Sequence, residues 1–333
     1  MAATLVLAAS AAQADFTIDT VPVGNAGNTG EWSGASYGGY GPDRICGAVA
    51  YEYNIGKYEV TAGQYTEFLS KVAGVDTYGL YNTSMWSSNC GCKIQRYAGS
   101  GTVGDPYQYR VGADWADRPV NWVSWGDAAR FANWLHNGQK SGLQDLTTTE
   151  DGAYYLNGAT TDLQLMAVTR EADWKWAIPT EDEWYKAAYH KNDGATGNYF
   201  RYPTSSDSKP SNDLIDPDPG NNATFWELGG TIGSPYYRTE VGAHENSESP
   251  YGTFDQGGNV WEWNEAIMAS CRGVRGGWSL GVGIYLKAAY RQYTYPTFGI
   301  RSTGFRVSEV PEPASAALLL MGGLALLVRN RRR

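Results

Sequence analysis

Short helices that carry their own start signals, set between long loops, limit most strongly what this chain can fold into. Thr61, Ser124 and Thr180 can each accept a hydrogen bond from a backbone N–H of the turn that follows, and a Gln, Asp or Glu stands three residues later. Apolar residues then recur at helical spacing. The inward-facing residues predicted for these helices are Tyr65, Phe68, Leu69 and Val72; Ala128, Phe131, Trp134 and Leu135; and Trp184, Ala187 and Ala188.

Glycine, asparagine and tyrosine are abundant between these helices. The chain has 41 Gly, 24 Tyr and 13 Trp residues, which favours tight turns and aromatic packing over a helical bundle. Residues 76–118 and 192–258 have the composition of loops, and an alternating segment that ends at Val60 predicts a strand. We therefore expect an irregular, loop-rich α+β domain over residues 50–308, preceded by a glycine-rich lead-in at 15–49 that is β-rich or a loop.

The N-terminal segment has features of an export signal. Residues 1–14 include a short apolar run and close on Ala12-Gln13-Ala14, small residues of the kind that a signal peptidase accepts. No Lys or Arg precedes the run, and a buried N-terminal helix is the alternative. We expect cleavage after Ala14 and export.

The C-terminal segment, residues 309–333, combines a Pro-Glu-Pro triplet, an apolar run over 314–328 and a terminal arginine cluster. This order resembles the PEP-CTERM sorting signal, which an exosortase reads in Gram-negative bacteria. The resemblance implies transient insertion into the inner membrane and sorting to the cell surface, the outer envelope or the extracellular matrix. An ordinary tail anchor satisfies the same hydropathy and is the alternative. The signal residues are Pro311, Glu312, Pro313, Arg329, Arg331, Arg332 and Arg333.

Between these ends the chain is acidic. Residues 15–310 hold 22 basic and 34 acidic residues, a net charge of −12, so we expect no nucleic acid as a partner. Four cysteines, Cys46, Cys90, Cys92 and Cys271, permit two disulfides in three pairings if the protein is exported. A local redox or metal pair at Cys90 and Cys92 is the alternative, although no histidine or further cysteine nearby completes a ligand set.

Six sequence blocks in a fixed order carry a second resemblance. The blocks are IGKYEVT at 55–61, PVNWVSWGDA at 119–128, IPTEDEWYKAA at 178–188, GNVWEW at 258–263, RGGWS at 275–279 and GFR at 304–306. Together they resemble the formylglycine-generating enzyme family, also called the sulfatase-modifying factor family. The resemblance implies a loop-rich α+β fold related to C-type lectins and, in the enzymes, oxygen-dependent oxidation of a cysteine in a sulfatase-like protein.

The paired copper-binding cysteines of these enzymes have no counterpart here. In the family the pair lies between the Arg-Gly-Gly block and the following Ala-Ala segment, and a thiolate pair suits Cu(I). Residues 277–288 read GWSLGVGIYLKA and contain no cysteine, and Cys271 precedes the Arg-Gly-Gly turn. We therefore expect no copper, and Cys271 is the one candidate catalytic residue, more readily a disulfide partner. Iron-binding relatives use three histidines, but His136, His190 and His244 are not within i, i+4 spacing of one another.

Calcium is the ion that the resemblance favours. In the family the turn of the GNVWEW block supplies backbone carbonyls and a glutamate carboxylate to a structural Ca²⁺, and hard oxygen ligands suit that ion. Matched to this sequence, the carbonyls are those of Gly257, Gly258 and Val260, and the carboxylate is that of Glu262. A second family site begins at Asn222, but its downstream acidic ligand has no clear match.

Other residues of the blocks are expected to support the scaffold. Arginines in such turns bind loop carbonyls or carboxylates, which is the role predicted for Arg275, Arg291 and Arg306. Trp261 and Trp263 are expected to fill the core. The blocks thus predict a family frame in which the site of the enzymes has lost its thiols.

Three functions follow from these observations. The first is non-catalytic binding of a glycan, an exopolysaccharide or a peptide at the cell surface, because aromatic faces stack on sugar rings and the catalytic cysteines are missing. The second is an oxidoreductase of the formylglycine-generating type that uses Cys271, or Cys90 and Cys92, in another arrangement. The third is a structural component of the envelope or matrix.

Overall fold

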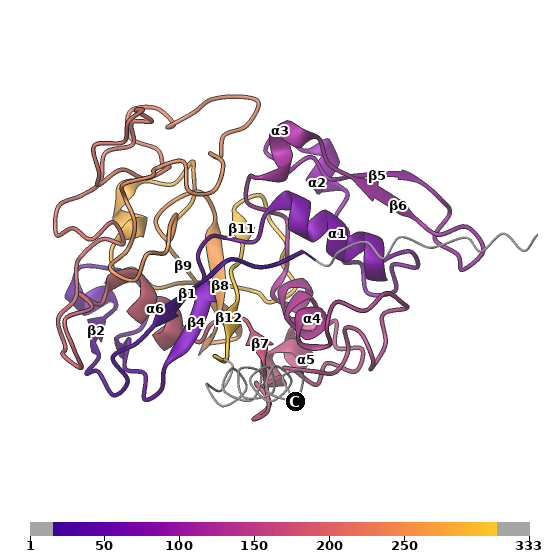
Figure 1. The fold of residues 1–333 in the computed structure, drawn as a ribbon, viewed down its shortest axis with the longest axis horizontal. Coiled ribbons are helices and arrows are strands. Elements are labelled where there is room, and N and C mark those ends of the chain that lie inside the picture. The colour runs from indigo at the N-terminus through magenta and orange to yellow at the C-terminus, as the bar shows by residue number, and fades with distance from the viewer. Residues whose placement is uncertain (1–15, 312–333) are drawn as a thin grey trace, which may run out of the picture.

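Two four-stranded sheets form the framework of the protein, and the computed structural model describes residues 16–311. One sheet has the strand order β1-β4-β12-β7 and the other β10-β9-β8-β11. The labelled strands of both sheets lie near the centre of the molecule in Figure 1. The strands of the first sheet are β1 (Thr20–Val23), β4 (Tyr53–Gly56), β12 (Ser308–Glu309) and β7 (Trp176–Ala177). Those of the second are β10 (Gln292–Thr294), β9 (Cys271–Arg275), β8 (Trp261–Met268) and β11 (Thr303–Gly304).

The first sheet joins the two ends of the described chain. Both β1 and β12 pair antiparallel with β4, so that Ile55 lies between Val21 and Ser308. In Figure 1 the indigo β1 and the yellow β12 accordingly flank β4. The lead-in is thus built into the fold, and it also contributes the small antiparallel pair β2 (Glu31–Ser33) and β3 (Arg44–Cys46).

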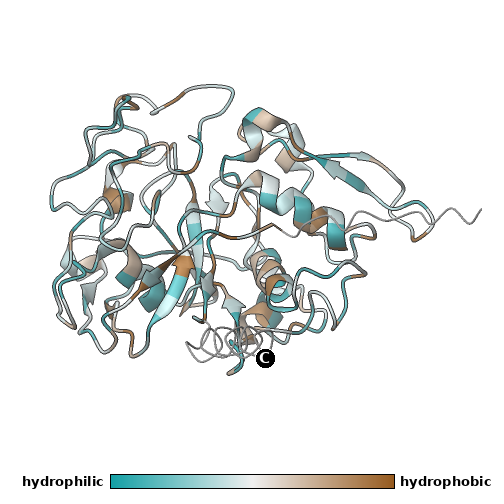
Figure 2. Ribbon diagram, viewed as in Figure 1, coloured by the Kyte–Doolittle hydropathy of each residue, from teal (hydrophilic) through white to brown (hydrophobic). Residues whose placement is uncertain are grey.

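The three predicted helices are confirmed. They are α1 (Ala62–Val72), α4 (Trp125–His136) and α6 (Glu181–Tyr189), and each begins with a complete capping box. All the predicted inward-facing residues are buried. Figure 2 shows the resulting mixture of hydrophobic and hydrophilic residues on α1 and α4.

Short elements were missed within the predicted loop of residues 76–118. This segment contains the helices α2 (Ser84–Ser87) and α3 (Ala113–Ala116) and the hairpin β5 (Gln95–Ala98) with β6 (Gln108–Arg110). A further helix, α5 (Asp162–Ala167), also begins with a capping box. Elements of three to six residues are too short for a periodic pattern, because they span two turns at most. Residues 192–258, by contrast, contain no assigned helix or strand, as predicted.

Aromatic rings join the helices to the sheets in the main core. Phe131 of α4 lies 5.2 Å from Phe68 of α1 and 5.2 Å from Phe305, with the rings edge to face. Such pairs add about 0.5–1.5 kcal/mol to the burial of the rings. Trp263 of β8 is fully buried and donates its indole N–H to the Val123 carbonyl at 2.9 Å. The α+β class and the loop-rich arrangement predicted from the sequence are therefore confirmed.

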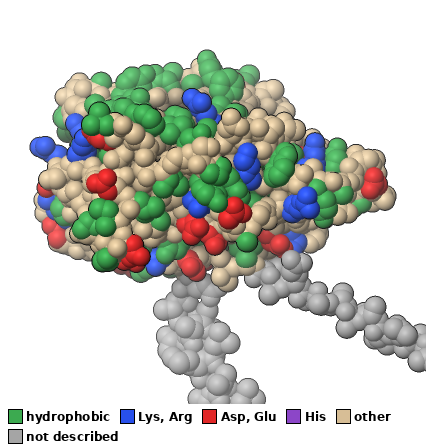
Figure 3. Space-filling view, turned by 90° about the horizontal axis from the view of Figure 1, so that it is seen from above, with side chains coloured by type: hydrophobic (Ala, Val, Ile, Leu, Met, Phe, Trp, Pro, Cys, Tyr) green, Lys and Arg blue, Asp and Glu red, His purple; other side chains and the backbone are tan. Residues whose placement is uncertain are grey.

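The predicted targeting segments lie outside the described residues. This holds for residues 1–14 and for the sorting signal after Pro311. Within residues 16–311, no helix combines the length and the apolar character needed to cross a membrane. Figure 3 shows one face of the molecule, on which Lys and Arg side chains lie scattered among hydrophobic and uncharged ones.

Candidate functional site

The Arg-Gly-Gly block forms the turn that follows β9. Gly276 and Gly277 have φ angles of 97° and 87°, in the left-handed region that favours glycine. A Cβ atom at Gly276 would lie only 2.6 Å from the Gln256 carbonyl oxygen. The turn leads into residues 278–287, the segment in which the enzymes of the family are expected to carry their cysteines.

Aromatic rings gather around this segment. Tyr285 lies on the 3-10 turn η2 (Gly283–Leu286), with its ring centroid 5.4 Å from that of Trp261 and 4.9 Å from that of Tyr290. Tyr290 stacks on Tyr40 at 5.4 Å. Trp261 is buried, whereas Tyr40 is 42% exposed. These four residues, which we call the aromatic row, run from the core to the surface.

Beside the row, Glu181 at the start of α6 joins three arginines. Its carboxylate accepts hydrogen bonds from Arg275 at 2.9 Å, from Arg291 at 2.7 and 2.8 Å, and from Arg44 at 2.9 Å. Burial alone would raise the pKa of Glu181, but Arg275 and Arg291 lower it to about 2. The predicted scaffold role of Arg275 and Arg291 agrees with this geometry.

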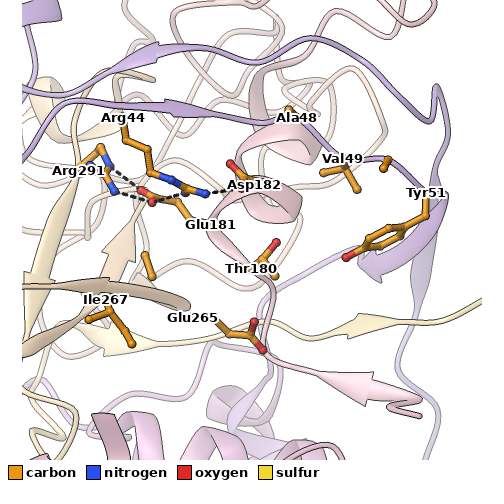
Figure 4. A pocket seen from close by; sticks show the side chains of 12 residues that line it. Arg44, Ala48, Val49, Tyr51, Thr180, Glu181, Asp182, Glu265, Ile267 and Arg291 are labelled. Atoms are coloured by element: carbon orange, nitrogen blue, oxygen red, sulfur yellow. Dashed lines mark hydrogen bonds and ion pairs between the residues drawn. The ribbon is translucent and has the colours of Figure 1, made fainter. Parts of the chain in front are cut away.

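A cavity of about 620 Å³ adjoins this network. Figure 4 shows Arg44 and Arg291 converging on Glu181, with Asp182 binding the same Arg44. Glu265, on another wall, is held 2.7 Å from Arg170. The charged groups that line the cavity are therefore already held in ion pairs, which fix its walls.

The predicted calcium ligand Glu262 forms an ion pair in the structure. Its carboxylate accepts hydrogen bonds from Arg306 at 2.5 and 2.7 Å and from the indole N–H of Trp184 at 2.8 Å. Both Glu262 and Arg306 are fully buried. Arg306 therefore neutralises the charge that Glu262 was predicted to offer to calcium.

Two further carboxylates, Glu59 and Asp255, share these surroundings. Burial raises the pKa of Glu59 well above its usual range, and the Asp255 and Glu262 carboxylates raise it further. Burial also raises the pKa of Asp255, to about 6. Oε1 of Glu59 has no hydrogen-bond partner. Three carboxylates thus face the single guanidinium of Arg306, and the excess negative charge requires protons or a cation.

The predicted turn itself is tightly packed. A Cβ atom at Gly257 would lie 2.7 Å from the ring of Pro203, and Gly258, with a φ of 98°, donates its N–H to the Gly276 carbonyl at 2.9 Å. Val260 is buried. The GNVWEW and Arg-Gly-Gly blocks therefore lie side by side, joined by the antiparallel pair of β8 and β9.

A calcium ion fits beside this turn with side-chain ligands that differ from the predicted one. Glu262 is committed to Arg306, but Glu59 and Asp255, which were not predicted, supply excess charge and an unpaired oxygen of the hard type that Ca²⁺ prefers. Within residues 16–311, no group of three or more His, Cys, Asp or Glu side chains lies close enough to hold a metal ion. A calcium ion here would thus depend on the backbone carbonyls of the turn.

The second predicted calcium residue, Asn222, belongs to a hydrogen-bonded node. Its amide donates to Asp218 at 2.6 Å, and Asp218 also accepts from the Ser247 hydroxyl at 2.7 Å. Four donors in all surround the Asp218 carboxylate, counting the backbone N–H groups of Gly220 and Asn246. Asn222 therefore helps to position this loop.

The four cysteines have free thiols in the structure, which differs from the predicted disulfides. Cys46 and Cys92 are buried in separate hydrophobic clusters, and Cys90 lies two residues from Cys92. Burial raises the pKa of Cys46, Cys92 and Cys271. A buried neutral thiol is a poor nucleophile, which weakens Cys271 as a catalytic candidate.

The histidines lie at three different places. His136 ends α4, where its Nδ1 accepts the Lys175 N–H at 3.1 Å, and His190 follows α6. His244 lies 3.0 Å from the Thr224 hydroxyl. Burial lowers the pKa of all three histidines. His136 and His190 thus both lie at the C-terminal ends of helices.

A domain family described as sulfatase-modifying factor enzyme 1-like matches residues 47–310. The chain therefore belongs to this family. No curated protein sequence matches the chain.

Solved structures resemble the fold. A variable protein 1 of Treponema denticola is 19% identical, with 89% of this chain and 98% of that one covered at a TM-score of 0.52. The structure of CarF is 20% identical in sequence, and the match covers 89% of this chain and 99% of CarF at a TM-score of 0.48. PvdO from Pseudomonas aeruginosa is 18% identical in sequence, and the match covers 87% of this chain and 94% of PvdO at a TM-score of 0.46. At these identities the first likeness supports the fold alone.

Proposed function

We propose that this protein is a non-catalytic, ligand-binding member of the family. The observation that supports this most directly is the aromatic row at the segment where the enzymes are expected to carry their cysteine pair. Trp278, in the same segment, lies under the guanidinium of Arg301 at 5.2 Å. Rings that reach the surface offer stacking area, whereas copper requires thiolates.

The ligand we propose is a glycan or a peptide at the cell surface or in the extracellular matrix. Aromatic side chains suit both, because each ring combines an apolar face with a polar edge or hydroxyl. The predicted sorting signal would deliver the protein there through an exosortase. Exopolysaccharide of the producing strain is the first ligand to test.

The alternative is a formylglycine-generating oxidoreductase. It would need Cys271, or Cys90 with Cys92, to act in place of the missing pair. Cys271 is 8% exposed and its pKa is raised by burial, which opposes formation of a thiolate. The third function is that of a structural matrix component. It predicts that deletion of the gene causes a matrix defect and that the protein binds no specific soluble ligand.

Incubation with a sulfatase-type cysteine peptide, with and without copper, is expected to leave the peptide mass unchanged. The physical reason is that residues 277–288 offer no thiolate pair to Cu(I). Mass spectrometry of the peptide measures the result. Conversion of its cysteine to formylglycine, lost in a Cys271→Ser variant, would establish the oxidoreductase instead.

A structural calcium ion is part of the proposal, held by Glu59, Asp255 and the carbonyls of the turn at 257–260. Adding Ca²⁺ after EDTA treatment is expected to raise the melting temperature, because the ion compensates excess buried negative charge. Glu59→Gln should abolish this increase, while Glu227→Gln, a surface control paired with Lys209, should retain it. An unchanged melting temperature in wild-type protein would exclude the ion.

A further inference from the structure

A pocket of about 510 Å³ lies outside the sites described above. One wall comes from β2 and the 3-10 turn η1 (Ala35–Tyr37), which precede the family match at residue 47. The other walls come from residues 199–209 and from residues 287–289. The lead-in therefore adds to the family domain a concave surface that the matched residues cannot form by themselves.

Trp32 and Tyr37 line one side of the pocket as a stacked pair of rings, which we call the aromatic wall. Their rings stack with centroids 5.4 Å apart and 7° between the planes. Trp32 is 50% and Tyr37 47% exposed, although both line a pocket. Exposed large rings held parallel in a hollow mark a binding surface more than a packing one.

The wall is held firmly against the domain. Ser33, next to Trp32, donates its hydroxyl to the Ala288 carbonyl at 2.8 Å, and the N–H of Gly34 donates to the Ala289 carbonyl at 3.0 Å. A Cβ atom at Gly34 would lie 2.5 Å from a carboxylate oxygen of Asp43, so the chain approaches closely there. The aromatic wall is thus preorganised, which reduces the entropy lost on binding.

Polar groups line the pocket beside the aromatic wall. The Glu31 carboxylate accepts a hydrogen bond from the Tyr185 hydroxyl at 2.7 Å. Burial raises its pKa, and the nearby Asp207 carboxylate raises it further. Arg201 and Lys287 also line the pocket, and no ion pair is recorded for their side chains within residues 16–311. Hydrogen-bond donors and acceptors therefore stand next to an aromatic plane.

We propose that this pocket binds a pyranose ring of a polysaccharide. The apolar C–H face of the ring would lie on the exposed face of Trp32 or Tyr37, and its hydroxyl groups would bind Glu31 and Lys287. The volume lies within the range of about 300–1,000 Å³ for small-molecule sites. The inference rests on the proposed binding function and deepens it by naming the ligand class and the pocket.

Isothermal titration calorimetry with cellohexaose, maltohexaose and hexagalacturonate tests the proposal on the full-length protein. We expect at least one to bind, and Trp32→Ala to weaken that affinity by about tenfold. Trp86→Ala is the matched control, because Trp86 is 46% exposed but lies on α2 away from the pocket. Its affinity should equal that of the wild type, and equal melting temperatures would show that both variants are folded.

Two other outcomes would contradict the assignment of this pocket as a saccharide-binding site. If no saccharide binds, or if Trp32→Ala binds as tightly as the wild type, the assignment is wrong. In the second case the proposed function stands, and Tyr40→Ala in the aromatic row becomes the variant that should lose affinity. Formylglycine formation, in contrast, would overturn the proposed function whatever the result for Trp32.

Discussion

Replacing Glu181 by glutamine is expected to lower the free energy of unfolding by about 3–5 kcal/mol. The carboxylate joins Arg44, Arg275 and Arg291, and the last two are buried with it. Glutamine keeps the shape but removes the charge, and two buried guanidinium groups then lack an anionic partner. Chemical denaturation at neutral pH measures the difference.

The pH dependence of this effect follows from the pKa of Glu181. The folded value of about 2 lies below the ordinary value of 4.5, so the stabilisation is present above pH 4.5 and is lost as the pH falls through about 2. The gap between wild type and Glu181→Gln should therefore close over that range. Glu227→Gln, whose partner Lys209 is 48% exposed, should cost less than about 1 kcal/mol. An equally small loss for Glu181→Gln would refute the network.

Arg306→Met is expected to cause a loss of similar size, about 3–5 kcal/mol at pH 7. The guanidinium binds Glu262 through two nitrogens and also donates to the Gly56 carbonyl at 2.9 Å. Without it, Glu59, Asp255 and Glu262 would share a buried space with no cation among their side-chain partners. Denaturant unfolding of the two proteins at pH 7 measures the loss.

Lower pH should partly rescue this variant. The pKa of Asp255 is already raised to about 6 in the wild type, and removal of Arg306 raises it further. The folded variant therefore takes up a proton at a higher pH than the wild-type value of about 6, and its stability relative to the wild type rises as the pH falls through that range. Arg110→Met, at an exposed arginine of β6, is the control and should change stability by about 0.5 kcal/mol or less. A loss for Arg306→Met that does not vary with pH would argue against repulsion among the carboxylates.

Local patterns were sufficient for the helices and the fold class. The capping boxes at Thr61, Ser124 and Thr180 lie within four residues each, so no distant contact is needed to form them. The apolar spacing behind them likewise identifies the buried face. The family blocks were recognisable because they combine these signals in a fixed order.

Charge partners could not be predicted, because they depend on contacts between distant segments. Glu181 lies in the first turn of α6, and nothing local marks Arg44 as its partner, 137 residues away. Glu262 matched a calcium ligand in the family, but Arg306 occupies its oxygens. Glu59, between Tyr58 and Val60 in an alternating segment, carried no sign of burial.

In the lead-in, too, some features were predicted from the sequence and others are seen only in the structure. Its composition indicated a β-rich segment or a loop, and the structure has the short strands β1, β2 and β3 there. The use of Trp32 and Tyr37 as a wall beside residues 199–209 follows only from the folded chain. The identity of an aromatic residue does not show whether its ring is exposed or buried.

The sequence alone determined the family, the helices and the absence of cysteine from residues 277–288, because each depends on residue identity or on spacing within a short segment. Tertiary structure decided which aromatic rings gather beside that segment and which carboxylates remain uncompensated. The reason is that burial and ion pairing are properties of neighbours brought together by folding. The aromatic row and the cluster of Glu59, Asp255 and Glu262 are formed by tertiary contacts and cannot be recognised in the sequence.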